Sequence, residues 1–140
     1  MEMTLSNGET FFFRSYKETD FNEVQRLNRD EGWTNLVSRG KETENAWHNS
    51  HIKFVATTMD EKEIIGYVRG LTDQHITLYI CELLIKDGFR GLGIGRELLH
   101  YVHGLYPDTR MELLASSSSH TYYEQLGFRN FPGFRRTLAE

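Results

Sequence analysis

The sequence predicts a mixed α/β domain built on a mostly antiparallel sheet with one parallel pair of strands. Two runs of β-branched and aromatic residues, 52–58 and 64–71, flank a polar turn and have the pattern of a β-hairpin. A longer apolar run, Ile76–Ile85, leads through a glycine-rich turn and an amphipathic helix to another strand, and such a crossover makes its two strands parallel. The 140 residues, 39% of them hydrophobic, suffice for one core, so residues 1–140 are expected to form one domain.

The N-terminal part is expected to contribute one strand and two helices. The aromatic segment Phe11–Tyr16 predicts the first strand, preceded by a frayed N-terminus. Asp20 and Glu23 resemble a capping box at the start of a helix over residues 20–31. Apolar residues repeat there at helical spacing: Phe21, Val24 and Leu27. A short second helix is expected over residues 42–49.

The C-terminal part begins with the amphipathic helix, which Pro107 should end. One face of this helix is apolar: Ile94, Leu98, Val102 and Leu105. A short strand is expected over 110–115 and a last helix over 118–126, with Gly127 as its C-cap. Residues 128–140 are expected to close the sheet.

Composition and charge exclude several classes of function. A net charge of −4 gives no basic footprint for nucleic acid, and Glu82 and Lys86 interrupt the longest apolar run, which is too short for a membrane helix. The single Cys81 and the polar N-terminus favour a cytoplasmic protein. His100 and His103 have helical spacing but no identifiable third ligand, so no metal is expected.

The stretch from Gly88 to Gly95 has the pattern of an anion site. A strand that feeds a glycine-rich loop and then a helix presents unpaired amides and the positive end of the helix dipole to a phosphate. A Walker A loop is absent, and a dinucleotide fingerprint starting at Gly91 would need a small residue in place of Arg96. A plain turn is the alternative, but three glycines within five residues would weaken it.

Glu82 is the residue in the Ile76–Ile85 strand that burial alone does not explain. A carboxylate in a buried strand is costly unless it is paired or functional. It could accept a proton from an ammonium substrate, directly or through water, or it could form a structural ion pair with Arg69 on the neighbouring strand.

Two motifs resemble those of the GNAT superfamily of N-acetyltransferases. Arg90, Gly93 and Gly95 fill its Gln/Arg-x-x-Gly-x-Gly/Ala signature, and Tyr122-Tyr-Glu-Gln-Leu-Gly-Phe128 resembles its late aromatic-Tyr-Glu-x-x-Gly-Phe element. The resemblance implies a mixed sheet of six to seven strands, with a central parallel pair that splays apart and about four flanking helices. It also implies acetyl-coenzyme A as the acetyl donor.

The resemblance assigns the donor site to two segments. Backbone amides of the loop would bind the pyrophosphate of the coenzyme: Arg90, Gly91, Leu92, Gly93, Ile94, Gly95 and Arg96. Backbone groups at Leu83, Leu84 and Ile85 would bind the pantetheine arm, and the Leu83 N–H would polarise the thioester carbonyl. Transfer in this family is direct, within a ternary complex, which leaves Cys81 as a small buried residue rather than a nucleophile.

The resemblance also suggests the acid and the base. Tyr123 would protonate the departing thiolate, and Tyr122 would belong to the core. Glu82 would take the proton of the amine, although the family has a second position for a base, which is Tyr79 here, and water is a third possibility. The segment Tyr79–Leu83 is similar to a Tyr-Ile-Tyr-Asp-Leu segment of aminoglycoside 3-N-acetyltransferases, which favours Glu82.

These features predict an N-acetyltransferase that acts on a primary amine of a small molecule or a peptide. A protein lysine or N-terminal acetyltransferase and a non-catalytic acyl-coenzyme A sensor are the alternatives. The resemblance places the acceptor wall in a segment that contains Trp33, Trp47, His48 and His51. Because family members are often dimers, a homodimer is a further expectation.

Overall fold

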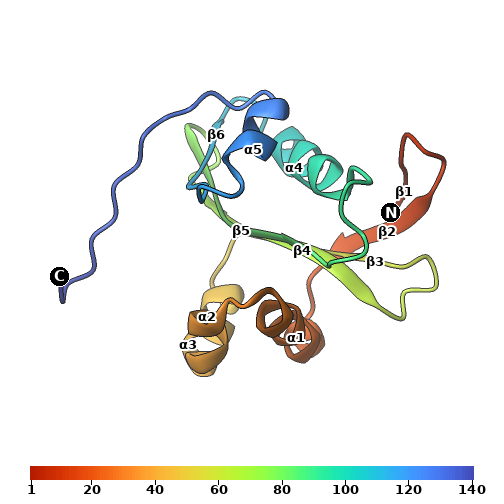
Figure 1. The fold of residues 1–140 in the computed structure, drawn as a ribbon, viewed down its shortest axis with the longest axis horizontal. Coiled ribbons are helices and arrows are strands. Elements are labelled where there is room, and N and C mark those ends of the chain that lie inside the picture. Colours follow the sequence, from red (N-terminus) through yellow and green to blue (C-terminus); the bar gives the residue numbers. More distant parts are fainter.

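One mixed sheet of six strands carries helices on both faces (Figure 1). The computed structural model describes all of residues 1–140 and confirms the predicted fold class. Helices α1–α3 cover one face of the sheet, and α4 and α5 lie on the other. The elements in chain order are β1 (Glu2–Thr4), β2 (Thr10–Ser15), a 3-10 turn (Glu18–Asp20), α1 (Phe21–Glu31), α2 (Thr34–Ser38), α3 (Gly40–His48), β3 (Ile52–Thr57), β4 (Ile64–Thr72), β5 (Thr77–Ile85), α4 (Ile94–Leu105), β6 (Arg110–Leu113) and α5 (His120–Gln125).

The strands follow one another across the sheet in sequence order, and every neighbouring pair except the last is antiparallel. The predicted β3–β4 hairpin is confirmed, with Ile52 opposite Gly70. The crossover through α4 makes β5 and β6 parallel, as expected, with Thr77 opposite Arg110 and Ile80 opposite Leu113.

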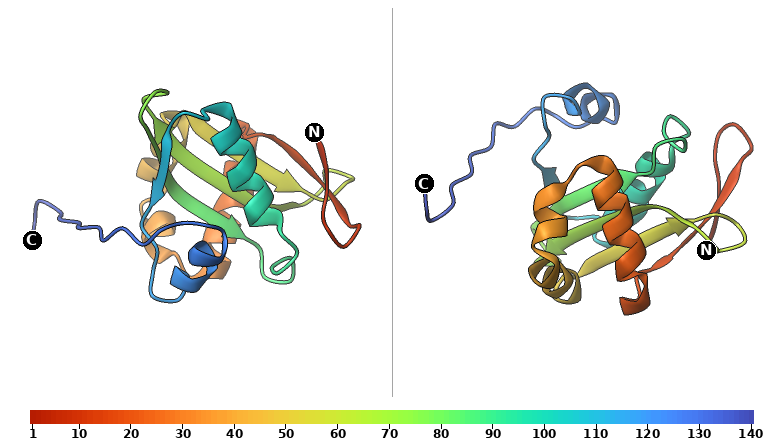
Figure 2. Two further views of the ribbon diagram at one scale, coloured as in Figure 1. Left: turned by 90° about the horizontal axis from the view of Figure 1, so that it is seen from above. Right: turned by 60° about the horizontal axis from the view of Figure 1, so that its bottom comes forward.

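The parallel pair lies at the edge of the sheet because the last segment adds no strand. The prediction that residues 128–140 close the sheet is wrong: they form no helix or strand and leave the body of the protein as an extended segment (Figure 2). Pro132 lacks the N–H that a ladder needs, and Gly133 passes so close to Leu114 that an added Cβ would lie 2.3 Å from its Cδ2. The outer edge of β6 therefore remains open.

The N-terminus differs from the prediction in two ways. Residues Glu2–Thr4 pair with β2 instead of fraying, and Leu5 behind them is buried. Asp20 and Glu23 form no capping box. Asp20 holds the Arg14 guanidinium through contacts of 2.8 and 2.9 Å, and Glu23 accepts a hydrogen bond from the Ile64 amide, 2.5 Å away. Both carboxylates thus tie the start of α1 to the sheet.

Two hydrophobic clusters fill the two sides of the sheet. The larger one packs α4 against the sheet, and the smaller one packs α1 and α3 against its other face, with Trp47 fully buried. Strand β5 contributes to both clusters: Ile80 and Leu83 face α4, whereas Leu84 faces α1. Ile80 and Leu83 are three positions apart and share a face because the strand is irregular between them. Both faces of β5 are therefore covered by hydrophobic side chains.

A β-bulge interrupts β5 in the middle. Arg69 lies opposite Glu82 and Gly70 lies opposite Ile80, so Cys81 is the extra residue without a partner on β4. Pairing of β5 with β6 ends at Ile80, directly before the bulge. A bulge bends its strand and increases the twist, and the part of β5 beyond it runs free of β6.

Gly70 should be nearly irreplaceable in this sheet. A Cβ at this position would lie 2.8 Å from the backbone oxygen of Tyr79, so we expect Gly70→Ala to destabilise the protein by about 2 kcal/mol. This loss should lower the melting temperature by roughly 5–10 °C in a scanning calorimeter. Gly104→Ala in α4 is the control, because no atom lies within 4 Å of its added Cβ. Equal melting temperatures for the two variants would contradict the assignment.

Candidate active site

A cleft of about 1140 Å³ lies beside the free half of β5. Its walls come from six segments: the end of α1 with α2, the strand β5, the glycine-rich loop with the start of α4, the end of β6 with the residues after it, α5, and the C-terminal segment at Arg135. Predicted donor residues and both predicted catalytic residues, Glu82 and Tyr123, border it. The cleft thus brings together groups that lie up to 104 positions apart in the chain, from Glu31 to Arg135.

The glycine-rich loop presents a row of free amides to this cleft. Gly91 and Gly93 have φ angles of +79° and +95°, in the left-handed region that favours glycine. The N–H groups from Gly91 to Arg96 donate to no acceptor in the protein, because α4 begins at Ile94 and its first amides lack intrahelical partners. These amides, together with the positive end of the α4 dipole, fit a phosphate group.

The side chains of Leu92 and Arg96 and the missing side chain of Gly95 have different surroundings. Leu92 packs its side chain against the larger core cluster, and the exposed Arg96 side chain borders the cleft. A Cβ at Gly95 would lie 2.4 Å from the Tyr122 Oη and 3.5 Å from Leu83 Cδ2. A side chain at this position would therefore displace the Tyr122 hydroxyl, whereas the distance to Leu83 is an ordinary contact.

The free half of β5 exposes backbone groups toward the same cleft. Lys86 donates to Ile65 on β4, and backbone groups alternate along a strand, so those of Leu83 and Ile85 point to the side that β6 leaves open. Leu84 was predicted to join them, but its backbone faces β4 and its side chain is buried in the smaller cluster. Leu84 is therefore not among the free groups of this edge.

The Arg90 side chain contacts two walls of the cleft. Its Nε donates to the Ile85 carbonyl at 2.9 Å, and its guanidinium forms an ion pair with Glu31 at the end of α1. The Arg90 side chain thus joins the loop to β5 and to the opposite wall. The Ile85 carbonyl is occupied by this bond, which leaves the Leu83 groups and the Ile85 N–H free.

Glu82 lies on the α1 side of the sheet in a paired state. Its two carboxylate oxygens accept from the Arg69 guanidinium at 2.7 and 2.6 Å, and Arg69 also donates to the Ser50 hydroxyl at 3.1 Å. Both side chains of the pair are mostly buried, at 15% and 13% exposure. The ion pair that the sequence left open as an alternative therefore exists, and Glu82 still borders the cleft.

Of the two adjacent tyrosines of α5, Tyr122 differs from the prediction. Tyr122, which was expected in the core, is 39% exposed, and its hydroxyl reaches the start of α4. Tyr123 packs edge-on against Tyr122 and Phe128, with ring centroids 5.1 and 5.6 Å away, and also borders the cleft. Two tyrosines therefore border the cleft, and each has a hydroxyl that could donate a proton there.

Burial keeps the nucleophilic groups of the cleft protonated. It raises the pKa of Tyr123 to about 12, with a smaller contribution from Tyr122. It also raises the pKa of the Cys81 thiol, which Arg69 opposes only in part. Cys81 therefore lacks the electropositive surroundings of a reactive cysteine, whereas Tyr123 retains a proton that it can donate.

One wall of the cleft is a helix that the sequence analysis did not predict, although it lies in the segment where the resemblance placed the acceptor wall. The short helix α2 contributes Thr34, Asn35 and Leu36 to the lining, next to Trp33. Trp33 was expected in an acceptor wall, but Trp47 lies in the core behind it. His48 and His51 do not border the cleft either: His48 lies near Glu18, and His51 accepts a long hydrogen bond from the Thr72 amide.

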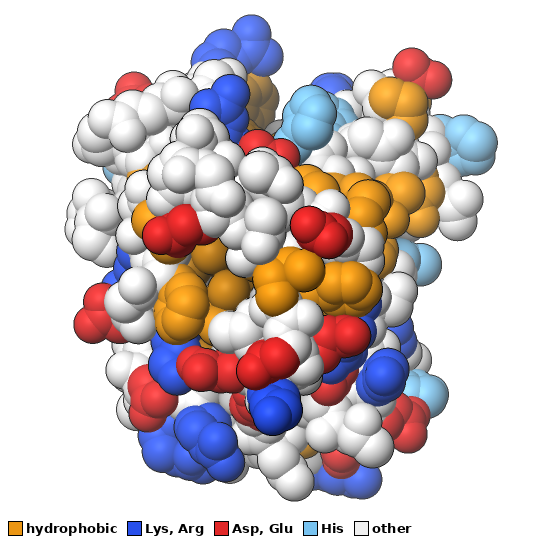
Figure 3. All heavy atoms as spheres, turned by 90° about the vertical axis from the view of Figure 1, so that its right-hand side faces the viewer, with side chains coloured by type: hydrophobic (Ala, Val, Ile, Leu, Met, Phe, Trp, Pro, Cys, Tyr) orange, Lys and Arg blue, Asp and Glu red, His pale blue; other side chains and the backbone are white.

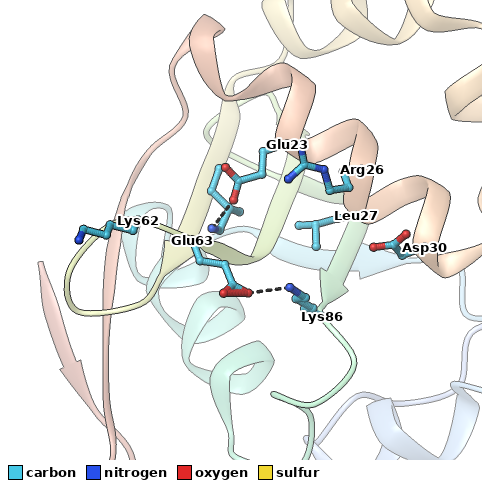
Figure 4. A pocket seen from close by; sticks show the side chains of 8 residues that line it. Glu23, Arg26, Leu27, Asp30, Lys62, Glu63 and Lys86 are labelled. Atoms are coloured by element: carbon cyan, nitrogen blue, oxygen red, sulfur yellow. Dashed lines mark hydrogen bonds and ion pairs between the residues drawn. The ribbon is translucent and has the colours of Figure 1, made fainter.

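A second, smaller cavity of about 320 Å³ lies between α1 and the β3–β4 turn (Figure 4). Two of its carboxylates already have partners. Glu63 pairs with Lys86 at 2.6 Å, and Glu23 holds the Ile64 amide (Figure 4). Neither the glycine-rich loop nor the open edge of β5 borders this cavity, so the large cleft is the candidate active site.

The rest of the molecule adds no competing site of the kinds that the sequence excluded. Acidic and basic side chains are interspersed on the face beside the β1–β2 hairpin, around a band of hydrophobic ones (Figure 3). No three His, Cys, Asp or Glu side chains are grouped to hold a metal ion. None of the helices could cross a bilayer, since α4, the longest, has 12 residues.

The buried tyrosines predict how stability depends on pH. Burial raises the pKa of Tyr16 and of Tyr123 to about 12, whereas an unfolded tyrosine ionises near pH 10. Between these values the folded state binds more protons, so the contribution of these tyrosines to the free energy of unfolding should be constant below about pH 10 and fall as the pH rises toward about 12. Urea unfolding at several pH values measures this, and Tyr16→Phe should reduce the slope. An unchanged slope in that variant would contradict the prediction.

Comparison with known proteins identifies relatives of the whole chain. The acetyltransferase (GNAT) domain family matches residues 14–136. An uncharacterized N-acetyltransferase of Prochlorococcus marinus, described as ycf52-like, is 29% identical over an alignment of 133 residues, which covers 91% of this chain and 73% of that protein.

Solved structures show the same fold at lower identity. A GNAT family acetyltransferase of Streptococcus pneumoniae superposes with a TM-score of 0.76 at 19% identity, over 93% of this chain and 99% of that one. The aminoglycoside N-acetyltransferase AAC(6′)-Iy, solved in complex with CoA, gives a TM-score of 0.70 at 16% identity, over 91% and 95% of the two chains.

Proposed function

Because the chain belongs to the GNAT family of acetyltransferases, we propose that it transfers an acetyl group from acetyl-coenzyme A to a primary amine of a small molecule or a peptide. The observation that carries this proposal is the convergence of two sets of free backbone groups on one cleft. The unpartnered amides from Gly91 to Arg96 suit a pyrophosphate, and the open edge of β5 suits an extended amide-containing arm.

The donor would supply its acetyl group as an activated thioester. In the proposed arrangement the Leu83 N–H donates a hydrogen bond to the thioester carbonyl, where negative charge develops as the amine attacks. Gly93 and Gly95 let the loop and α4 approach the phosphates closely. Because the amine attacks directly, no protein nucleophile is needed, in agreement with the protonated state favoured at Cys81.

The acid and the base are assigned to the two sides of the cleft. Tyr123 keeps its proton at neutral pH and would give it to the departing thiolate. Glu82 would accept the proton of the amine, directly or through a water molecule, while Arg69 holds its carboxylate in place. Tyr79, on the same strand, remains the alternative position for a base.

A thiol-release assay tests the proposed function. Purified protein is mixed with acetyl-coenzyme A and one of four amines: kanamycin, spermidine, glucosamine or a lysine-containing peptide. We expect free thiol with at least one of them, and a product heavier by one acetyl group in the mass spectrum. Acetylation of the peptide alone would favour a protein acetyltransferase. Binding of coenzyme A without thiol release from any amine would contradict the proposal and favour a sensor.

A further inference from the structure

Helix α2 lines the cleft although little in its own sequence holds it there. It has five residues, Thr34–Ser38, no side-chain cap and no buried residue. Isolated helices shorter than about 12–15 residues are marginal in water, so α2 cannot depend on its own hydrogen bonds. Its position beside β5 must come from contacts with other elements.

The backbone carbonyl of Leu36 provides the main attachment. It accepts hydrogen bonds from the Gln25 side-chain amide of α1 at 3.0 Å and from the Thr43 hydroxyl of α3 at 2.7 Å, and the single proton of that hydroxyl is shared with the Arg39 carbonyl at 2.9 Å. Both donors are buried, at 8% and 6% exposure, where an unpaired polar group would be costly. The carbonyl is therefore fixed from two sides, and Leu36 borders the cleft at this point.

The orientation of Gln25 is itself determined by a buried chain of hydrogen bonds. Asn28 donates to the Gln25 side-chain oxygen at 2.9 Å, and the Tyr67 hydroxyl donates to the Asn28 oxygen at 2.5 Å. Asn28 and Tyr67 are completely buried. Because burial raises the pKa of Tyr67 well above its ordinary value, this hydroxyl remains a donor. With its oxygen occupied, Gln25 must present its NH₂ group to Leu36.

The series of hydrogen bonds starts on β4, the strand whose Arg69 also binds the Glu82 carboxylate. Tyr67 and Arg69 lie two positions apart on β4, so their side chains leave the same face of the sheet, and Arg69 fixes the Glu82 carboxylate. The wall formed by α2 and the Glu82 carboxylate are thus both positioned from β4. A molecule bound between them would have its distance to Glu82 set by this strand.

We propose that Gln25 is a positioning residue for the acceptor: through the hydrogen-bonded series Tyr67–Asn28–Gln25, it holds the α2 wall at a fixed distance from Glu82 (an inference that rests on the proposed function). Gln25 touches no reacting atom. Without it, α2 would have to become ordered each time an acceptor binds, and that cost would weaken acceptor binding but not donor binding.

Gln25→Met tests this role because it removes both hydrogen bonds at nearly constant volume. We expect the KM of the best amine of the four-compound panel to rise about ten-fold, with kcat and the KM of acetyl-coenzyme A within about two-fold of wild type. Hydrogen exchange of the amides in Thr34–Ser38 should accelerate about ten-fold or more. Thr43→Val, which removes the second donor to Leu36, should change both quantities in the same direction.

Val24→Ala is the matched control, since Val24 is its fully buried neighbour on α1 and is not part of the hydrogen-bonded series. It should lower the melting temperature while leaving the acceptor KM and the exchange of α2 unchanged. An active wild type whose acceptor KM responds equally to Gln25→Met and Val24→Ala, or to neither, would overturn the inference. Failure of the proposed function would look different, because the wild type would then release no thiol with any amine.

Discussion

Replacing Tyr123 by phenylalanine should lower kcat at least about ten-fold while leaving the affinity for coenzyme A nearly unchanged, as expected for the loss of a general acid. The physical reason is the buried hydroxyl, whose pKa of about 12 keeps it protonated at the pH of the reaction. Phenylalanine retains the ring that packs against Phe128, so the fold should persist. Steady-state kinetics with the best amine, together with calorimetric titration of coenzyme A, measure the two effects separately.

Tyr122→Phe is the control that the chain itself offers. The Tyr122 hydroxyl lies close to Gly95 at the start of α4, and the donor loop should therefore be affected more than proton transfer. We expect its kcat to stay within about three-fold of wild type. If Tyr122→Phe lost turnover and Tyr123→Phe kept it, the acid would be Tyr122 and the assignment by sequence position would be wrong.

Glu82→Gln should also lower kcat at least about ten-fold, because the amide cannot accept the proton of the amine. A purely structural role of Glu82 in the bidentate ion pair with Arg69 would give a different result. If Glu82 served only that pair, the variant would lose stability, and its folded fraction would turn over at the wild-type rate. Kinetics and thermal unfolding of the same preparation distinguish a base from a structural carboxylate.

Ser50→Ala provides the comparison for this experiment. It removes the other hydrogen bond of the Arg69 guanidinium without touching Glu82. Its effect on kcat should be less than about three-fold, while its effect on stability should be about 1 kcal/mol. A loss of turnover as large as that of Glu82→Gln would show that the position of Arg69, rather than the Glu82 carboxylate, limits the reaction.

The sequence predicts those parts of the fold and the site that local patterns determine. Apolar periodicity locates α4 and the strands β3–β5, and glycine spacing locates the donor loop. Helix α2 has too few residues and no apolar repeat, so no pattern marks it. The group of Leu36 that accepts the hydrogen bonds is its backbone carbonyl, which every residue type has, so the residue type at position 36 could not predict this attachment.

Contacts between distant segments were predictable only in part. The Arg69–Glu82 pair follows from placing two strands side by side, and it was foreseen as an alternative to catalysis. The ion pair between Arg90 and Glu31 joins residues 59 positions apart and depends on how α1 packs over the sheet. The exposure of Tyr122 depends likewise on the rotation of a six-residue helix, which its sequence alone does not determine.

The bulge at Cys81 makes the sheet less regular at the place where the proposed donor site needs a free strand edge. Deleting that single residue would bring Arg69–Glu82 and Gly70–Ile80 into one continuous ladder, because the flanking residues already have the correct facing. The straightened strand could then continue its pairing with β6 and satisfy the Leu83 amide internally. Such a protein would have a more regular sheet and no free edge for a donor. The irregularity in β5 thus coincides with the start of the free edge that the proposed donor site requires.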